Sequence, residues 1–138
     1  MKGLDTNVLV RWLLDGSLVE DDSPGQMEAA RRTVSRSTEP FLVDNVVLAE
    51  ATWILHSKVK QSRRQIAVVF GHMLSSPDVV FENDEAVLVA LQGYQAHGGD
   101  FADHLIGSVN RSLGCSTTFT FDRVAARSPL FTHLKGKT

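Results

Sequence analysis

The 138-residue sequence predicts an α/β domain in which helices cover a central parallel sheet of four to five strands. Two observations lead to this prediction: short apolar runs alternate with segments of helical periodicity, and turn or capping residues separate them. Parallel strands need a crossover connection, usually a helix, so the alternation favours a parallel sheet. Neither an internal repeat nor a linker interrupts the pattern, and we expect one domain over residues 1–138.

The expected elements follow one another closely along the chain. Strands are predicted at residues 2–6, 40–43, 77–81, 115–121 and, as the fifth, 130–134. Helices are predicted at residues 7–15, 26–37, 46–57, 66–74, 85–98, 101–114 and 123–127. The first strand should be buried, and the helix after it should present an apolar face of Val8, Leu9, Trp12 and Leu13. Residues 15–25, with Gly16 and Pro24, should form a polar connection.

Several helix starts are marked by residues that can cap them. The tetrapeptide SRRQ at residues 62–65 matches a capping box, in which the first and last side chains bond each other's backbone N–H groups. Other residues whose side chains accept hydrogen bonds from a first helical turn are Asp44 or Asn45, Asn83 or Asp84, and Asp100. Gly98 and Gly99 favour a helix end, as does Gly114.

Composition excludes several classes of protein. Hydrophobic residues make up 43% of the chain and charged residues 22%, which excludes a disordered chain. The net charge of −2 excludes a bulk polycation, so nucleic acid would have to bind local patches. The single cysteine, Cys115, cannot form a disulfide or a cysteine-based zinc site, and we expect it to be buried in the fourth strand. With no signal peptide and no membrane-length apolar run, we expect a cytoplasmic protein.

Carboxylates stand at positions where a core-forming sequence would normally avoid them. Asp5 ends the first strand and Asp122 ends the fourth, and ligand sites in parallel sheets form at the carboxyl ends of strands. Glu50 lies inside an apolar helix, while Asp103 shares a helix stripe with Gly107 and Asn110. Each acid also has a structural interpretation, as a cap, as a first-turn acid or as part of an exposed stripe.

Carboxylates that are brought together repel one another, and a divalent cation would relieve that repulsion. Ligands that are all oxygen select Mg²⁺ or Mn²⁺ rather than zinc. Two such ions, roughly 3.5–4 Å apart, can activate water and stabilise the leaving oxygen of a phosphodiester. The acids therefore suggest metal-dependent cleavage of a phosphodiester.

Four segments, LDTNVLVR, VLAEATWIL, DFADHLIG and TFTFD, together resemble a PIN-domain ribonuclease, most closely the VapC-type toxins of bacterial toxin–antitoxin pairs. The resemblance spans Asp5 to Arg127 and implies a PIN-like three-layer α/β/α sandwich. It also implies an Mg²⁺- or Mn²⁺-dependent endoribonuclease toxin that hydrolyses tRNA, rRNA or mRNA. The toxin would be neutralised by a cognate VapB-type antitoxin and would self-associate as a homodimer.

The resemblance assigns roles to individual residues. The catalytic and metal-binding acids would be Asp5, Glu50, Asp103 and Asp122, supported by Asn7, Thr120 and Asp100. RNA phosphates need a positive rim, for which Arg11 and Arg123 are the first candidates. His104 follows Asp103 where a small residue is more usual, so the wall of the substrate groove would differ there.

Other functions remain open at this point. A catalytically inactive PIN-like binding module would bind Mg²⁺ without cutting RNA, and a nuclease could act on DNA instead. A receiver-like α/β signalling domain would need a phospho-accepting aspartate after a middle strand and a lysine after a late one. The segments PDVVFEND and LFTHLK match that requirement poorly.

Overall fold

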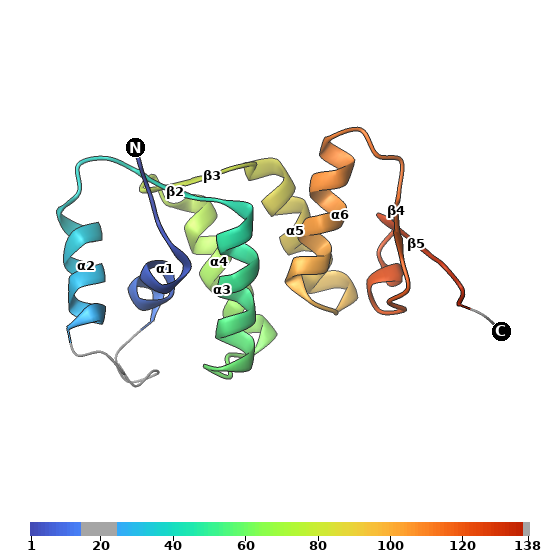
Figure 1. Cartoon of the computed structure of the whole chain (residues 1–138), viewed down its shortest axis with the longest axis horizontal. Coiled ribbons are helices and arrows are strands. Elements are labelled where there is room, and N and C mark those ends of the chain that lie inside the picture. The colour runs from blue at the N-terminus through green and yellow to red at the C-terminus, as the bar shows by residue number, and fades with distance from the viewer. Residues whose placement is uncertain (15–24, 137–138) are drawn as a thin grey trace. The chain divides into compact units, whose positions relative to one another are not determined.

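The computed structural model describes residues 1–14 and 25–136, which form two compact units, Met1–Glu82 and Asn83–Thr138 (Figure 1). Residues 15–24 of the expected polar connection, with Gly16 and Pro24, lie outside the described residues. Both units combine helices with parallel strands. The predicted α/β class with parallel pairing is therefore confirmed.

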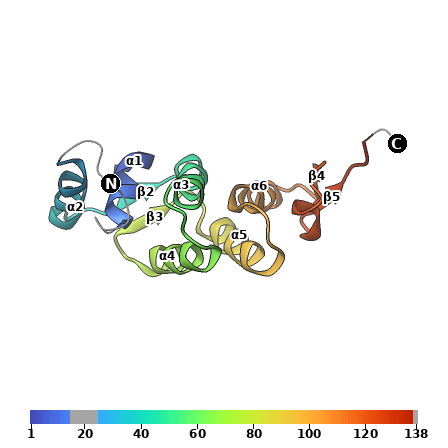
Figure 2. The same ribbon diagram turned by 90° about the horizontal axis from the view of Figure 1, so that it is seen from below.

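The first unit contains a parallel sheet in the order β1-β2-β3. Its elements are β1 (Lys2–Gly3), α1 (Thr6–Leu13), α2 (Gln26–Arg36), β2 (Phe41–Val43), α3 (Asn45–Ser57), α4 (Arg63–Ser75) and β3 (Val79–Phe81). Helix α1 lies between α2 and α3 and packs against both (Figures 1 and 2). Fully buried side chains from these elements, including Leu9, Val43, Leu48, Leu55 and Ile66, form the core.

The second unit pairs two helices and adds a two-stranded parallel sheet. Its elements are α5 (Asp84–His97), α6 (Phe101–Ser112), β4 (Thr118–Thr120), the 3₁₀ turn η1 (Ala125–Arg127) and β5 (Phe131–His133). Helices α5 and α6 run side by side (Figures 1 and 2). On α6, Gly107 leaves room for the Phe131 ring, because a Cβ there would lie 2.7 Å from Cε2 of that ring. Gly107 thus lets an aromatic side chain approach the helix closely.

The predicted caps are largely confirmed. The Asp44 carboxylate accepts a hydrogen bond from Val47 N at 2.9 Å and so begins α3. Ser62 and Gln65 form the complete capping box of α4. Asn83 begins α5 by accepting a hydrogen bond from Ala86 N at 3.0 Å. Local sequence therefore determines where these helices begin.

Three predictions are corrected. The five expected strands pair as three and two rather than in one sheet. The first strand is only two exposed residues long, and burial begins at Leu4, the residue before Asp5. The expected apolar face of α1 is also shifted: Leu9 and Val10 are buried, whereas Trp12 and Leu13 are only partly covered.

Cys115 is exposed and precedes β4, so the prediction of a buried strand residue is wrong. The reason is the turn that ends α6. Gly114 has a φ of 102°, and the Cys115 N–H donates to the Asn110 carbonyl at 3.0 Å. Cys115 therefore belongs to the helix-ending turn, and the strand begins only at Thr118.

Among the described residues, no helix is both long and apolar enough to cross a lipid bilayer.

Candidate active site

Asp5 connects the end of the first strand to α1. Its backbone is extended, with φ −76° and ψ 159°, and its carboxylate oxygen Oδ1 accepts a hydrogen bond from Thr6 N at 2.7 Å. The Asp5 carbonyl accepts hydrogen bonds from Val8 N and Leu9 N and starts the helical ladder. The capping interpretation of Asp5 is thus correct, and this bond uses Oδ1 of a side chain that is exposed as a whole.

Asn7 and Arg11 lie on α1, one turn apart. Asn7 is exposed, and its backbone carbonyl accepts a hydrogen bond from Arg11 Nη1 at 3.4 Å. Arg11 is half-buried, so its guanidinium belongs partly to the fold. The RNA-binding role of Arg11 stays a prediction, and the structure adds that its guanidinium bonds its own helix.

Glu50 is exposed on α3, the helix against which α1 packs. Val46 and Trp53, one turn to either side, are 66% and 61% exposed. The Lys58 ammonium lies 5.7 Å from the centre of the Trp53 ring. No ion pair to Glu50 is found among the described residues. Glu50 therefore lies on an exposed stripe, as its structural interpretation required, and water solvates its charge.

The second unit brings three carboxylates within electrostatic reach of one another, and we call Asp100, Asp103 and Asp122 the acidic cluster. Burial raises the pKa of the Asp103 carboxyl above its ordinary value, and the negative charges of Asp100 and then Asp122 raise it further. The neighbouring His104 partly opposes this rise in the Asp103 pKa. The ionised form of Asp103 is thus less favoured than that of a free aspartate, and a bound cation would offset this penalty.

Asp100 occupies the N-cap position of α6, but its side chain makes no capping hydrogen bond. Its backbone carbonyl accepts hydrogen bonds from Asp103 N at 3.1 Å and His104 N at 3.4 Å, which start the helix. The prediction that Asp100 is the N-cap residue of α6 is therefore confirmed, but the prediction that its carboxylate accepts a capping hydrogen bond is wrong. That carboxylate remains exposed at the start of α6, near Asp103.

Asp122 is held in place by its own turn. Its Oδ1 accepts hydrogen bonds from Val124 N at 2.8 Å and Ala125 N at 3.2 Å, while its own N–H donates to Thr120 Oγ1 at 3.0 Å. Thr120 therefore supports the backbone of the last acid, consistent with its expected supporting place. As at Asp5, one carboxylate oxygen serves the backbone and the other points away from that bond.

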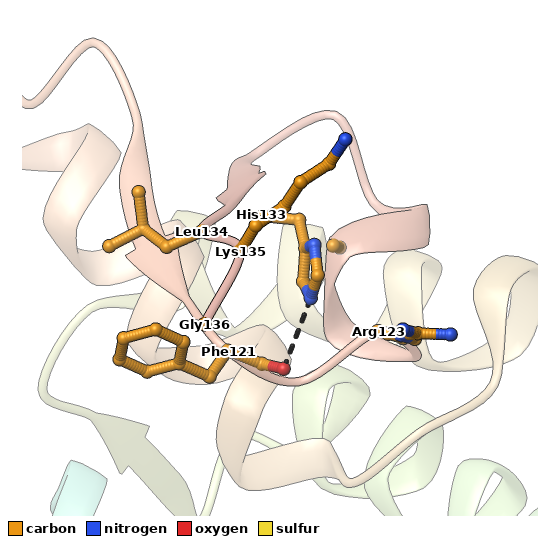
Figure 3. A pocket seen from close by; sticks show the side chains of 7 residues that line it. Phe121, Arg123, His133, Leu134, Lys135 and Gly136 are labelled. Carbon is orange, nitrogen blue, oxygen red and sulfur yellow. Dashed lines mark hydrogen bonds between the residues drawn. The ribbon is translucent and has the colours of Figure 1, made fainter. Parts of the chain in front are cut away.

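Arg123 lines a hollow of about 730 Å³ next to Asp122, together with His133 and Lys135 (Figure 3). His133 Nε2 donates a hydrogen bond to the Phe121 carbonyl at 3.2 Å, and Arg123 itself is exposed. Two basic side chains, Arg123 and Lys135, thus line a hollow that directly follows Asp122 in the chain. The sequence singled out Arg123 but missed Lys135, because only the pairing of β4 with β5 brings the end of the chain to this place.

The predicted site residues are grouped within each unit. The first unit carries Asp5 and Asn7 on or before α1, which packs on the helix of Glu50. The second unit carries the acidic cluster and Thr120. No set of three or more His, Cys, Asp or Glu side chains is arranged to hold an ion within residues 1–14 and 25–136. The chemistry of the donors, carboxylate oxygens with a raised pKa among them, nevertheless suits a hard divalent cation.

A family model for the PIN domain matches residues 3–129. The chain belongs to the PIN domain family. Searches of curated proteins and of solved structures found no match. PIN domains are typically metal-dependent nucleases that act on RNA, so membership indicates nuclease function in general and removes the receiver-like alternative.

Proposed function

We propose that this PIN protein is a VapC-like endoribonuclease toxin that uses Mg²⁺ or Mn²⁺ to hydrolyse tRNA, rRNA or mRNA in the cytoplasm. The family match supports the proposal because it runs through both units, and we propose that residues 1–138 act as a single PIN domain. The single observation that carries the proposal is the acidic cluster, in which the pKa of Asp103 is raised by burial and by two neighbouring acids.

The acids have distinct parts in this proposal. The proposed catalytic and metal-binding residues are Asp5, Glu50, Asp103 and Asp122, with Asn7, Thr120 and Asp100 in support. Divalent ions held by such oxygens lower the pKa of water and stabilise negative charge on a leaving oxygen. Asp5 and Asp122 bind backbone N–H groups through one oxygen each, which fixes the carboxylate for ligation by the other. The exposed Arg123 would bind an RNA phosphate beside Asp122.

RNA cleavage with mapping of the ends tests the nuclease proposal. Purified protein is incubated with total RNA and Mg²⁺ or Mn²⁺, and the new ends are identified. Hydrolysis by activated water should leave 5′-phosphate and 3′-hydroxyl ends, whereas attack by the 2′-hydroxyl would leave a cyclic phosphate. Cyclic phosphate ends would contradict the metal-dependent nuclease proposal. Mg²⁺ binding without cleavage would instead favour an inactive binding module, and cutting of DNA alone would move the assignment to a deoxyribonuclease.

The toxin role needs a separate test. Expression of the chain alone should arrest growth, and co-expression of a neighbouring VapB-type antitoxin should restore it. We also propose a homodimer, which light scattering of the purified chain would measure. A protein that is harmless without any partner would overturn the toxin role and leave the nuclease proposal standing.

A further inference from the structure

The hollow at the edge of the second unit's sheet is lined by residues that the proposed chemistry uses only in part. Phe121 and Arg123 follow the carboxyl end of β4, and Leu134 and Lys135 follow that of β5. Ligand sites in parallel sheets form beyond the carboxyl ends of the strands. The volume of about 730 Å³ lies within the range of roughly 300–1,000 Å³ that is typical of small-ligand sites. The hollow therefore has the position and the size of a ligand site.

Hydrogen bonds between the two strand ends hold the walls of this hollow together. Leu134 N donates to the Thr120 carbonyl at 2.8 Å, one residue beyond the last paired position of β5. His133 Nε2 donates to the Phe121 carbonyl at 3.2 Å, from inside the hollow (Figure 3). The residues after β4 and those after β5 are thus held side by side, and the hollow is a preformed feature of the sheet edge.

The lining of the hollow combines positive charge with an exposed aromatic ring. Arg123 and Lys135 are exposed, and neither forms an ion pair among the described residues. Phe121 is 70% exposed, and Figure 3 shows its ring and the Arg123 side chain on opposite sides of His133. Within the described part of the chain, no acid lines the hollow. Cations bind the phosphates of nucleic acids, and aromatic rings stack on unpaired bases, so this combination suits a nucleotide.

We propose that this hollow binds one unpaired nucleotide of the RNA, with the base stacked on Phe121 and the phosphate held by Arg123 and Lys135. The inference rests on the proposed function for its substrate, since Phe121 and Arg123 flank the proposed metal ligand Asp122 in the chain. A base inside a duplex is already stacked between its neighbours and cannot lie on the Phe121 ring. Phe121 should therefore contribute to the binding of single-stranded RNA and not to that of duplex RNA.

A matched pair of phenylalanine variants tests the stacking. Phe121→Leu and Phe119→Leu make the same change two residues apart, and Phe119 is 65% exposed but does not line the hollow. Fluorescence anisotropy of a labelled single-stranded oligoribonucleotide in EDTA measures binding without cleavage. We expect Phe121→Leu to weaken binding at least about fivefold and Phe119→Leu to stay within about twofold of wild type. Phe121→Trp should keep the wild-type affinity, because it keeps an aromatic face. Equal affinities of the two leucine variants would overturn the proposal.

Duplex RNA and salt separate the contribution of the base from that of the phosphate. Phe121→Leu should leave the affinity for duplex RNA unchanged, and its loss with single-stranded RNA should be similar at every salt concentration. Lys135→Gln should instead weaken the binding of single-stranded RNA most at low salt and lower the salt dependence by about one phosphate contact. An equal loss of duplex and single-stranded binding in Phe121→Leu would overturn the proposal, as would an unchanged salt dependence in Lys135→Gln.

The same measurements distinguish this inference from the proposed function. Wild type that binds RNA through Phe121 but cuts none with Mg²⁺ or Mn²⁺ overturns only the nuclease proposal. Wild type that cuts RNA while both leucine variants bind it equally overturns only the nucleotide site. If Phe121→Leu kept its RNA affinity but no longer bound the antitoxin, the hollow would belong to a protein partner, and the proposal would be overturned.

Discussion

The two units place their acids in different electrostatic surroundings. In the first unit, Asp5 is bound to a backbone N–H and Glu50 is exposed on α3. In the second, three acids interact and the pKa of Asp103 is raised. The fold keeps these mutually repelling carboxylates together, which suggests that they were selected for function rather than for stability. The second unit therefore holds the carboxylates whose charge a cation would stabilise most.

Removal of metal should produce the largest effect. EDTA should reduce RNA cleavage to background, and Mg²⁺ or Mn²⁺ should restore it, because the proposed mechanism needs the divalent ion to lower the pKa of the attacking water. Ca²⁺ is expected to bind without supporting turnover. Cleavage assays with each ion measure this, and activity that survives thorough chelation would exclude the metal mechanism.

Metal should also act on stability. A cation that binds only the folded protein raises its melting temperature in proportion to the logarithm of ligand concentration. We expect this rise for wild type in Mn²⁺ and a smaller one for Asp103→Asn. An equal rise in both proteins would show that the acidic cluster is not where the ion binds.

Neutralising one acid in each unit sharpens the comparison. Asp5→Asn and Asp103→Asn should each lower the cleavage rate by at least about a hundredfold, more than typical losses from second-shell changes. Glu50→Gln should behave alike, and a double variant should lose little more than either single variant if the acids act as one unit. Single-turnover cleavage rates measure this.

The control is Asp78→Asn, which changes an exposed aspartate outside the four motifs. It should cut RNA at the wild-type rate. If Asp5→Asn also retained the wild-type rate, Asp5 would be a helix cap and nothing more, since asparagine caps about as well as aspartate. Retention of activity only in Asp5→Asn would place the chemistry in the second unit alone.

Local signals in the sequence predicted much of the fold. The capping box of Ser62 and Gln65 and the N-caps Asp44 and Asn83 are confirmed, because caps depend on residues three apart in the chain. The exposure of Cys115 could not be predicted from its apolar surroundings. It follows from the left-handed Gly114 and the backbone bond to Asn110, which postpone the strand.

The sequence predicted which residues belong to the candidate site, but it did not predict how their charges interact. The motifs placed Asp103 and Asp122 in the sequence, but the raised pKa of Asp103 depends on burial and on an acid nineteen positions away (122 minus 103). Likewise, the sequence could not show that Asp100 leaves the capping bond unmade. His104 looked like a residue of the groove wall, and only the packing of α5 on α6 shows that it is buried.

Arg123 and Arg11 should contribute differently to RNA binding, and these effects should be smaller than the losses of cleavage above. Arg123→Ala should weaken binding several-fold and lower the salt dependence by about one phosphate contact, because Arg123 is exposed in the basic hollow. Arg11→Ala should change the salt dependence less and the melting temperature more, because Arg11 is half-buried and bonds the Asn7 carbonyl. Binding titrations at several salt concentrations measure both.

Arg64→Ala, an exposed arginine on α4, serves as the control for a general loss of charge. Equal salt slopes for the Arg123 and Arg64 variants would remove Arg123 from the RNA-binding surface. A steep loss for Arg11→Ala without any change in melting temperature would reverse the assignment of the two arginines.

The smallest effect is the dependence of metal-free stability on pH, and it should have opposite signs in the two units. Because the pKa of Asp103 is raised in the folded protein, its contribution to folding stability is fully present below the ordinary aspartate pKa. That contribution is lost as pH rises through the raised pKa. Asp103→Asn should therefore raise the melting temperature at neutral pH by roughly 1–3 °C, since partly exposed charges are screened by water. It should also remove that loss of stability between acid and neutral pH.

Glu39 in the first unit provides the opposite case. Its hydrogen bond to the N-terminal amine, followed by the charges of that amine and of Lys2, lowers the pKa of Glu39. A group with a lowered pKa stabilises the folded protein at pH values above the ordinary glutamate pKa. This stabilisation is lost as pH falls through the lowered pKa. Glu39→Gln should thus slightly lower the melting temperature at neutral pH and have no effect at strongly acidic pH. Thermal melts of both variants between acid and neutral pH decide the point. If the two variants shifted the melting temperature in the same direction at neutral pH, Asp103 would not be under the repulsion inferred for the second unit.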